Sequence, residues 1–287
     1  MLQLTAKKKL NKRSAIPLTL PDKNNIVDAL PQGTVFLGEL VTGVDLPAAP
    51  LNIWYKDQQG FYYWGGGVSV SEITIPQPLP LFANLELPLT RAQCLTCARW
   101  MNTNFGEKFS KAVTGTPFSK ELLFAIACQE TAIYWQKWIA TQPKEEILGR
   151  CVFDASGDVN HTRMAFPKDT PAFIKAYGNA IADELIAEAN KTRAWHGWGP
   201  KQWVYAGYGI FQYDLQHIKT DEAFFTEKKW YSMDECLVKV MLELNTKWKK
   251  FPNDLFKTVK AYNGSGIRAE HYAQNVFQFM DWIQKGL

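Results

Sequence analysis

The spacing of apolar residues changes along the chain and divides it into two parts. Residues 1 to about 75 carry short runs of Val, Phe, Trp and Tyr between turn-forming residues, a pattern typical of β-strands. From about residue 90 onward, apolar residues recur at intervals of three and four, which predicts helices. Prolines that favour an extended, stiff path separate the two patterns, at Pro76, Pro78, Pro80 and Pro88. We therefore predict a small all-β domain over 1–75, a proline-rich linker over 76–89 and a mainly α domain over 90–287.

One hairpin stands out in the β part. Residues 53–56 and 61–64 are rich in aromatic and β-branched residues, and the polar loop 57–60 between them ends in Gly. A turn at residues 31–33, which contains Pro and Gly, precedes a predicted strand at 34–37.

Capping residues set the predicted starts of the helices. Thr90 with Gln93 has the form of a capping box and opens a helix that we expect to run to about Met101. Ser119 can cap the next helix, which ends before Pro143. Further helices are predicted over 144–153, from 170 to about 196, from 232 onward, over 254–262 and over 267–283.

Glu130 lies within the apolar stripe of the Ser119 helix. Leu122, Ile126, Ile133 and Tyr134 form this stripe, and Glu130 follows Ile126 by four residues. Burial removes hydration from a carboxylate, penalises the charged form and raises the pKa, which suits a general acid near neutral pH. The alternative is a carboxylate at the rim of the helix or one paired with Arg or Lys.

Composition limits the classes of partner. The chain has 46% apolar residues and a net charge of +4, without the basic stripe of a nucleic-acid-binding protein, so we expect no nucleic acid. No apolar run reaches membrane-spanning length. Eleven Trp and eleven Tyr favour stacking surfaces of the kind that sugars use, although most aromatic residues build the core.

The five cysteines and four histidines suggest no metal site. Cys94 and Cys97 have a spacing found in zinc sites, but no second pair follows, so we predict buried, reduced thiols. The histidines show neither metal-binding spacing nor a nucleophile motif. We expect no metal and no cofactor.

The β part resembles bacterial SH3-like modules. Leu10-Asn11 with Arg13-Ser14 is similar to the opening motif of that family, and residues 31–35 are similar to its central turn and strand. The resemblance implies an SH3-like barrel that binds wall peptides. The aromatic residues that could bind them, or could instead form the core of the barrel, are Trp54, Tyr62, Tyr63 and Trp64.

Two glycine-containing segments follow the Glu130 helix. They are Gly209-Ile210-Phe211-Gln212 and Ala261-Tyr262-Asn263-Gly264. Together with Glu130-Thr131, and in this order, they resemble the lysozyme-like fold of goose-type lysozymes and soluble lytic transglycosylases. Phe211 stands where that family usually has Met, and the Gly-Ser-Gly after Asn263 replaces its usual Ala-Gly-Pro-Gly.

The resemblance implies a peptidoglycan-cleaving glycosidase. Glu130 would protonate the glycosidic oxygen of the β-1,4 bond between N-acetylmuramic acid and N-acetylglucosamine. Goose-type lysozymes carry acidic residues in a loop after their Glu, which implies Asp154 or Asp158 as the base of a hydrolase. The implied substrate-binding residues are Thr131, Gly209, Gln212, Tyr213, Tyr262 and Asn263.

Several alternatives stay open at this point. Lytic transglycosylases need no second carboxylate, because the C6 hydroxyl of the substrate closes an anhydro ring, and both Asp residues could then be turn formers. A non-catalytic wall-binding protein of the same fold is another alternative, and so is an enzyme acting on chitin or chitosan. The first thirty residues lack the apolar segment of a signal peptide, so we expect delivery to the bacterial wall by phage lysis or specialised secretion.

Overall fold

The computed structural model describes most of the chain, namely residues 2–17, 23–41, 53–72 and 85–287. The chain forms two compact units. The first comprises Met1–Gln77 with Val113–Phe118, and the second comprises Pro78–Ala112 with Ser119–Leu287. Most of the predicted linker, up to residue 84, lies outside the described residues.

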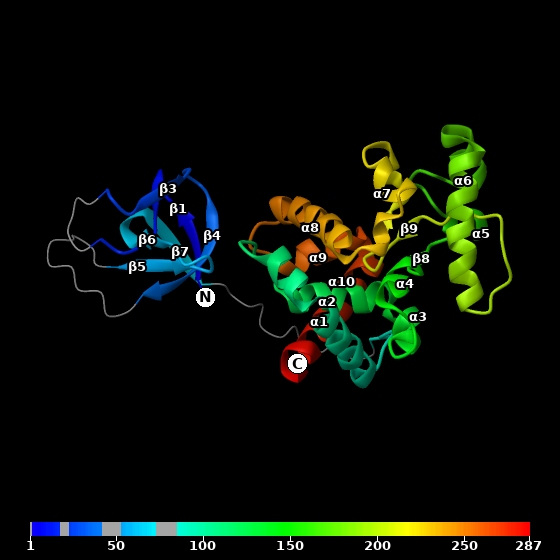
Figure 1. Cartoon of the computed structure of the whole chain (residues 1–287), viewed down its shortest axis with the longest axis horizontal. Helices are drawn as coiled ribbons and strands as arrows, with labels where there is room; N and C mark the ends of the chain where they lie inside the picture. The colour runs from blue at the N-terminus through cyan, green and yellow to red at the C-terminus, as the bar shows by residue number, and fades with distance from the viewer. Residues whose placement is uncertain (1, 18–22, 42–52, 73–84) are drawn as a thin grey trace. The chain divides into compact units, whose positions relative to one another are not determined.

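In the part of the chain that the structure describes, the first unit contains seven antiparallel strands in one sheet (Figure 1). The strand order is β3-β2-β6-β5-β4-β1-β7. Within the described residues no pairing joins the edge strands β3 and β7, so the sheet is not closed. The strands are β1 (Leu2–Ala6), β2 (Leu10–Arg13), β3 (Ile26–Leu30), β4 (Val35–Val41), β5 (Trp54–Asp57), β6 (Tyr62–Trp64) and β7 (Val68–Glu72). The prediction that this part of the chain forms β-strands is confirmed, and the strands form an antiparallel sheet rather than a closed barrel in the described residues.

The predicted hairpin is confirmed by the antiparallel pairing of β5 and β6. The Asp57 carboxylate closes its loop and accepts hydrogen bonds from the backbone N–H groups of Gln59 and Phe61, each at 2.9 Å. The Tyr63 hydroxyl donates to the same carboxylate at 2.7 Å. Gly60 has a φ of 89°, a conformation that glycine adopts without steric cost.

The second unit is mainly helical, as predicted, and contains one small sheet. The sheet has the order β10-β9-β8. Its strands are β8 (Val152–Phe153), β9 (Gly207–Tyr208) and β10 (Tyr213–Asp214). The α-helices are α1 (Arg91–Val113), α2 (Lys120–Ala127), α3 (Ile133–Trp135), α4 (Lys144–Gly149), α5 (Ser156–Val159), α6 (Thr170–Trp195), α7 (Glu222–Thr226), α8 (Met233–Lys250), α9 (Leu255–Asn263) and α10 (Gly266–Gly286).

The capping predictions agree with the observed helix starts. The Gln93 carboxamide accepts from the Thr90 N–H at 2.9 Å, and the Gln93 N–H donates to the Thr90 hydroxyl at 3.3 Å. The Ser119 hydroxyl accepts from the N–H of Leu122 at 3.2 Å. Two predicted ends are wrong: α1 continues to Val113, and the helix predicted over 144–153 stops at Gly149, where the chain enters β8.

The helix α2 lies at the centre of the unit. Its residues from Leu122 to Ala127 have no solvent exposure, and such a helix must be surrounded by protein on every side. Helix α10 packs against α2 and also against α9. Figure 1 shows α10 crossing behind α2, so the C-terminal helix runs beside the end of α2 that leads to Glu130.

All five cysteine side chains are buried, as predicted for core residues. Within the described ranges, no helix has both the length and the apolar content needed to cross a bilayer.

Candidate active site

Glu130 lies in a π-helical turn, Cys128–Ala132, between α2 and α3. A π turn contains one residue more than an α turn, and such turns occur frequently at functional sites. The buried neighbour Thr131 anchors this turn, because its hydroxyl donates to the carbonyl of Ile210 at 2.9 Å. The same hydroxyl accepts from the indole N–H of Trp135 at 3.0 Å. Thr131 therefore links two parts of the site, namely the turn that carries Glu130 and the segment that contains Gln212.

The Glu130 carboxyl group is half-buried and has one direct hydrogen-bonding neighbour in the described residues. The Tyr272 hydroxyl of α10 donates to Glu130 Oε1 at 2.6 Å. Burial raises the pKa of Glu130 from 4.5 to about 7, and the hydrogen bond from Tyr272 only partly opposes this rise. A carboxyl group with a pKa near neutrality holds its proton in a large fraction of molecules and can donate it to a leaving oxygen.

The Gly209–Gln212 segment forms a tight turn whose conformation requires glycine. Gly209 has a φ of 77°, and a Cβ there would lie 2.9 Å from the Cys236 Sγ and 3.2 Å from the Trp230 Cβ. The Gln212 N–H donates to the Gly209 carbonyl at 2.9 Å. The Gln212 side chain donates to the carbonyls of Gly209 at 2.9 Å and Cys151 at 3.2 Å. These bonds hold the Gln212 carboxamide in one orientation.

Tyr262 connects α9 to the same turn. Its hydroxyl donates to the carbonyl of Phe211 at 2.8 Å, and its ring stacks on Tyr272 with centroids 6.3 Å apart. Burial, followed by the nearby charges of Glu130 and Glu243, raises the pKa of Tyr262 well above its ordinary value. Tyr262 is therefore protonated at physiological pH and serves as a hydrogen-bond donor.

These elements enclose a cleft of about 480 Å³. A volume of this size lies within the range of small-ligand sites. Six of the predicted site residues line it, namely Glu130, Asp154, Gln212, Tyr213, Tyr262 and Asn263. Thr131 and Gly209 do not line the cleft; both are buried behind its wall, where they shape the two turns described above.

The two candidate bases lie in different places. Asp154 lines the cleft, and its carboxylate accepts from the N–H of Ser156 at 3.0 Å and pairs with Arg163 at 3.2 Å. Asp158 is not among the lining residues. Its carboxylate accepts from the backbone N–H of Thr170 at 3.1 Å and from the Thr170 hydroxyl at 2.9 Å, so it secures the first turn of α6.

Arg163 also joins Asp154 to a further carboxylate of the cleft. Its guanidinium donates to Asp214 Oδ1 at 2.6 Å and to the carbonyls of Phe166 and Pro167, each at 2.9 Å. The Arg163 side chain is only 8% exposed, whereas its partners Asp154 and Asp214 are 40% and 30% exposed. These contacts give the loop around Asp154 a defined position.

A second glutamate lines the cleft without any motif that identifies it. Glu243 of α8 lies 3.5 Å from the His217 Nε2 and 3.4 Å from the Lys247 Nζ. It follows the buried Val240 by three residues, which places it at the edge of the buried face of α8. That position is the only sequence signal for Glu243, and many surface glutamates share it.

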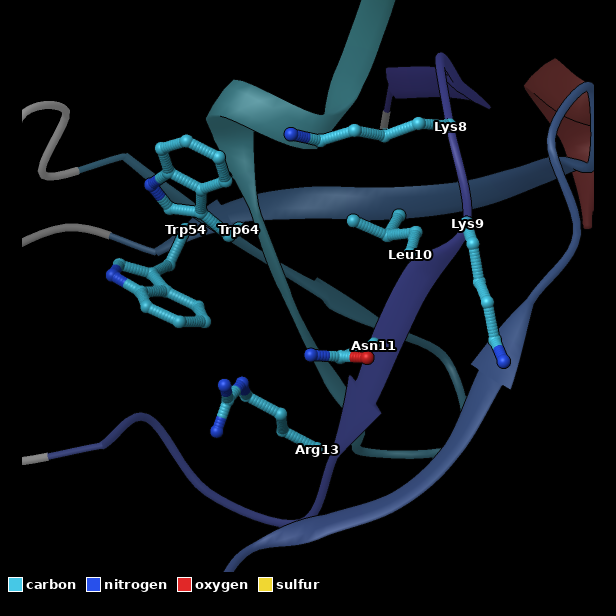
Figure 2. Close-up of a pocket in the computed structure, with 7 residues that line it drawn as sticks. All are labelled: Lys8, Lys9, Leu10, Asn11, Arg13, Trp54 and Trp64. Atoms are coloured by element: carbon cyan, nitrogen blue, oxygen red, sulfur yellow. The ribbon is translucent and has the colours of Figure 1, made fainter. Parts of the chain in front are cut away.

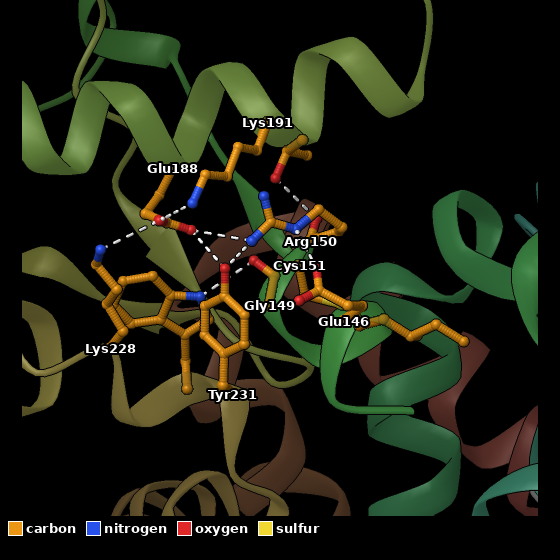
Figure 3. Close-up of polar contacts among 11 residues, drawn as sticks. Glu146, Gly149, Arg150, Cys151, Glu188, Lys191, Lys228 and Tyr231 are labelled. Carbon is orange, nitrogen blue, oxygen red and sulfur yellow. Dashed lines mark hydrogen bonds and ion pairs between the residues drawn. The ribbon is translucent and has the colours of Figure 1, made fainter. Parts of the chain in front are cut away.

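A cluster of charges around the buried Glu188 supports the strand that precedes Asp154 (Figure 3). Glu188 is 1% exposed, and its carboxylate accepts from Arg150 at 2.9 Å and from the Tyr231 hydroxyl at 2.6 Å. Lys191 and Lys228 pair with its second oxygen at 2.7 and 3.3 Å. A buried carboxylate needs such partners, because it would otherwise be unstable in its charged form.

The cluster in Figure 3 is connected to the site through the backbone. Arg150 is followed by Cys151, whose carbonyl accepts from both the Gly209 N–H, at 2.8 Å, and the Gln212 side chain. The Thr192 hydroxyl of α6 donates to the Arg150 carbonyl at 3.1 Å. The cluster thus holds the chain that enters β8 and orients Gln212.

The first unit has a separate pocket of about 480 Å³ (Figure 2). Its lining residues are Lys8, Lys9, Leu10, Asn11, Arg13, Trp54 and Trp64. Figure 2 shows the two indole rings on one side, with Lys8 above and Arg13 below. Two of the four aromatic residues proposed for wall binding, Trp54 and Trp64, thus line a pocket, with Trp54 itself only 1% exposed. Tyr63, also 1% exposed, belongs to the core of the sheet.

Among the described residues, no group of three or more His, Cys, Asp or Glu side chains could hold a metal ion. Comparison with known proteins gave no match, since no protein-family model, no curated protein and no solved structure is significantly similar to the chain.

Proposed function

We propose that the chain cleaves the β-1,4 bond between N-acetylmuramic acid and N-acetylglucosamine in peptidoglycan, with Glu130 as the general acid. The observation that carries this proposal is that Glu130 lines a cleft with a pKa raised by burial to about 7. A surface glutamate is almost entirely ionised at neutral pH and cannot protonate a glycosidic oxygen.

The arrangement of the three short motifs supports the proposal. Glu130-Thr131, Gly209–Gln212 and Ala261–Gly264 are far apart in the sequence, yet hydrogen bonds of Thr131 and Tyr262 join all three at one cleft. That convergence supports the resemblance to the lysozyme-like fold of goose-type lysozymes and lytic transglycosylases. For the first unit, the antiparallel sheet supports an SH3-like module, although its described strands do not close into the expected barrel.

In the proposed hydrolysis, Glu130 donates its proton to the leaving oxygen while positive charge develops on the sugar ring. Asp154 is the proposed base, because it lines the same cleft and contacts with Arg163 and the Ser156 N–H orient its carboxylate. It would activate a water molecule on the opposite face of the sugar, as in inverting glycosidases. We assign Asp158 no catalytic part, because its carboxylate secures the start of α6.

A lytic transglycosylase is the second candidate, and one observation favours it. Both oxygens of Asp154 already have partners, Oδ1 with the Ser156 N–H and Oδ2 with Arg163. These two partners occupy lone pairs that the carboxylate would otherwise offer to a water molecule. In that case the C6 hydroxyl of the substrate attacks instead, Glu130 acts first as acid and then as base, and the product carries an anhydro ring.

The pocket of the first unit is the proposed site for wall peptides. These peptides carry carboxylates, and the pocket combines the cationic side chains of Lys8, Lys9 and Arg13 with indole rings and contains no acidic lining residue. Sedimentation of the full-length Glu130→Gln protein with insoluble peptidoglycan tests this proposal. Trp64→Ala should reduce the bound fraction, and unchanged binding would exclude the pocket.

Product analysis tests the reaction and distinguishes the two candidates. Purified peptidoglycan is digested and the fragments are analysed by mass spectrometry. The hydrolase should yield reducing ends, and Asp154→Asn should slow it by about 10² to 10⁴. Asp158→Asn is the matched control, since a residue that only secures a helix should leave the rate nearly unchanged in the folded protein. An anhydro product, one water lighter, would support the transglycosylase.

A further inference from the structure

Aromatic side chains gather where α6 ends, outside the residues that line the cleft. The ring of His196 stacks on Trp198 with centroids 4.3 Å apart and planes inclined by 17°. Trp138 meets Trp195 at 4.7 Å and His196 at 4.8 Å. We call this group, with two further partly exposed rings, the aromatic platform: Tyr134, Trp138, Trp195, His196, Trp198 and Trp203.

The platform is partly exposed to solvent, and hydrogen bonds fix the loop that carries Trp198 and Trp203. Trp198 is 39% exposed. Arg193 of α6 lies under its ring at 5.8 Å and under the ring of Trp203 at 5.3 Å. The Arg193 guanidinium also donates to the carbonyl of Gly199 at 2.6 Å, and Asn190 exchanges two hydrogen bonds with the backbone of Lys201. A rigid set of exposed rings loses little conformational entropy when it binds a ligand.

Two short chain segments connect the platform to the carboxylates proposed for the reaction. Tyr134 follows Glu130 by four residues, through the π turn. Its ring stacks on Phe153 at 4.2 Å with planes 24° apart, and Phe153 directly precedes Asp154. A polymer that leaves the cleft along these segments would therefore reach Tyr134 first.

The aromatic side chains of the platform suit a ring-shaped ligand that has an apolar face. Burial, and then the charge of Lys137, lowers the pKa of His196 to about 4, so its imidazole is neutral at physiological pH. Flat rings of this kind pack against the apolar faces of sugars, and Trp and Tyr contribute a large contact area at low entropic cost. Cationic side chains flank the rings: Lys137 lies over Trp138 at 4.4 Å and Lys201 over Trp203 at 5.0 Å.

We propose that the aromatic platform binds sugar rings of the glycan strand beyond the scissile bond. The ligand class is a β-1,4-linked polymer of N-acetylated amino sugars, and the inference rests on the proposed function of the cleft. The platform lengthens the binding site, so that a long strand binds more tightly than a short one.

The test measures binding separately from cleavage. The full-length Glu130→Gln protein is titrated by calorimetry with the hexamer and the trimer of β-1,4-linked N-acetylglucosamine. Trp198→Ala in this background should weaken hexamer binding at least about fivefold, the usual effect of removing a Trp from a contact, with a smaller effect on the trimer. Trp198→Phe retains a ring and should preserve most of the affinity.

Trp282→Ala is the matched control, because Trp282 is also partly exposed in the second unit but lies in α10 and contacts Phe279. Its hexamer affinity should equal that of the parent. Equal affinities of the Trp198→Ala and Trp282→Ala proteins for the hexamer would overturn the proposal that the platform binds glycan. The proposal would also be overturned if the hexamer failed to bind while the wild-type protein still cleared peptidoglycan. Absence of both binding and clearing would overturn the proposed function together with the platform.

Discussion

Replacing Glu130 by Gln should stabilise the protein at neutral and alkaline pH. The folded protein holds the Glu130 proton up to a pKa of about 7, whereas the unfolded chain releases it near the ordinary value of 4.5. Between these values the folded state binds more protons than the unfolded state, so wild-type stability falls as pH rises. Glutamine does not titrate and removes this dependence.

The magnitude follows from the two pKa values. Above pH 7 their difference lowers the free energy of unfolding of the wild type by about 3 kcal/mol. Partial exposure of the Glu130 side chain reduces this loss to about 2 kcal/mol. Below the unfolded pKa of 4.5 this contribution is absent, since both states are protonated. The Gln carboxamide oxygen can still accept the hydrogen bond from Tyr272, which limits any loss from that contact.

Urea unfolding of the wild-type and Glu130→Gln proteins at several pH values measures the difference directly. The stability of the variant relative to the wild type should increase from about pH 4.5 to about pH 7 and then level off. A constant difference across this range would show that Glu130 has an ordinary pKa, and would remove the physical basis for its role as an acid.

Three further substitutions test other parts of the site. Tyr272→Phe removes a hydrogen bond that lowers the pKa of Glu130, so the alkaline limb of the pH–activity profile should move to higher pH; an unmoved limb would exclude this role. Gly209→Ala places a Cβ at a residue with positive φ and against the buried thiol of Cys236. Thermal unfolding should show a loss of about 1 to 3 kcal/mol in the free energy of unfolding, and wild-type stability would contradict the tight packing at this turn. Glu188→Ala leaves the buried Arg150 guanidinium with only the exposed Glu146, 3.8 Å away, as an ionic partner, and chemical unfolding should show a loss of about 3 to 5 kcal/mol. A loss below about 1 kcal/mol would mean that water or Glu146 replaces the Glu188 carboxylate.

Local sequence signals were sufficient for the elements that depend on neighbouring residues. The hairpin of β5 and β6, the Thr90 capping box and the Ser119 cap could be predicted, because each is decided within a few residues. The end of α4 could not be predicted in this way. The helix stops where the chain enters β8, and β8 pairs with β9, which lies more than fifty residues further along the chain.

Long-range contacts also explain what the sequence did not reveal about the site. Tyr272 approaches Glu130 because α10 packs against α2, and no local pattern distinguishes this Tyr from the others. Arg163, which holds Asp154 and Asp214, lies in a loop without periodicity. The π turn at Glu130 was equally unpredictable, since its residues fit an α-helical pattern and its extra residue depends on the packing around Thr131.

The most direct test of the central claim compares the wild-type and Glu130→Gln proteins on purified peptidoglycan. Turbidity and released fragments are followed at a pH below 7, where Glu130 is mostly protonated. The proposed mechanism predicts that the wild-type protein clears the suspension and releases glycan fragments, and that the Gln variant, although folded and at least as stable, does neither. Clearing by the Gln variant at the wild-type rate would contradict the assignment of Glu130 as the acid.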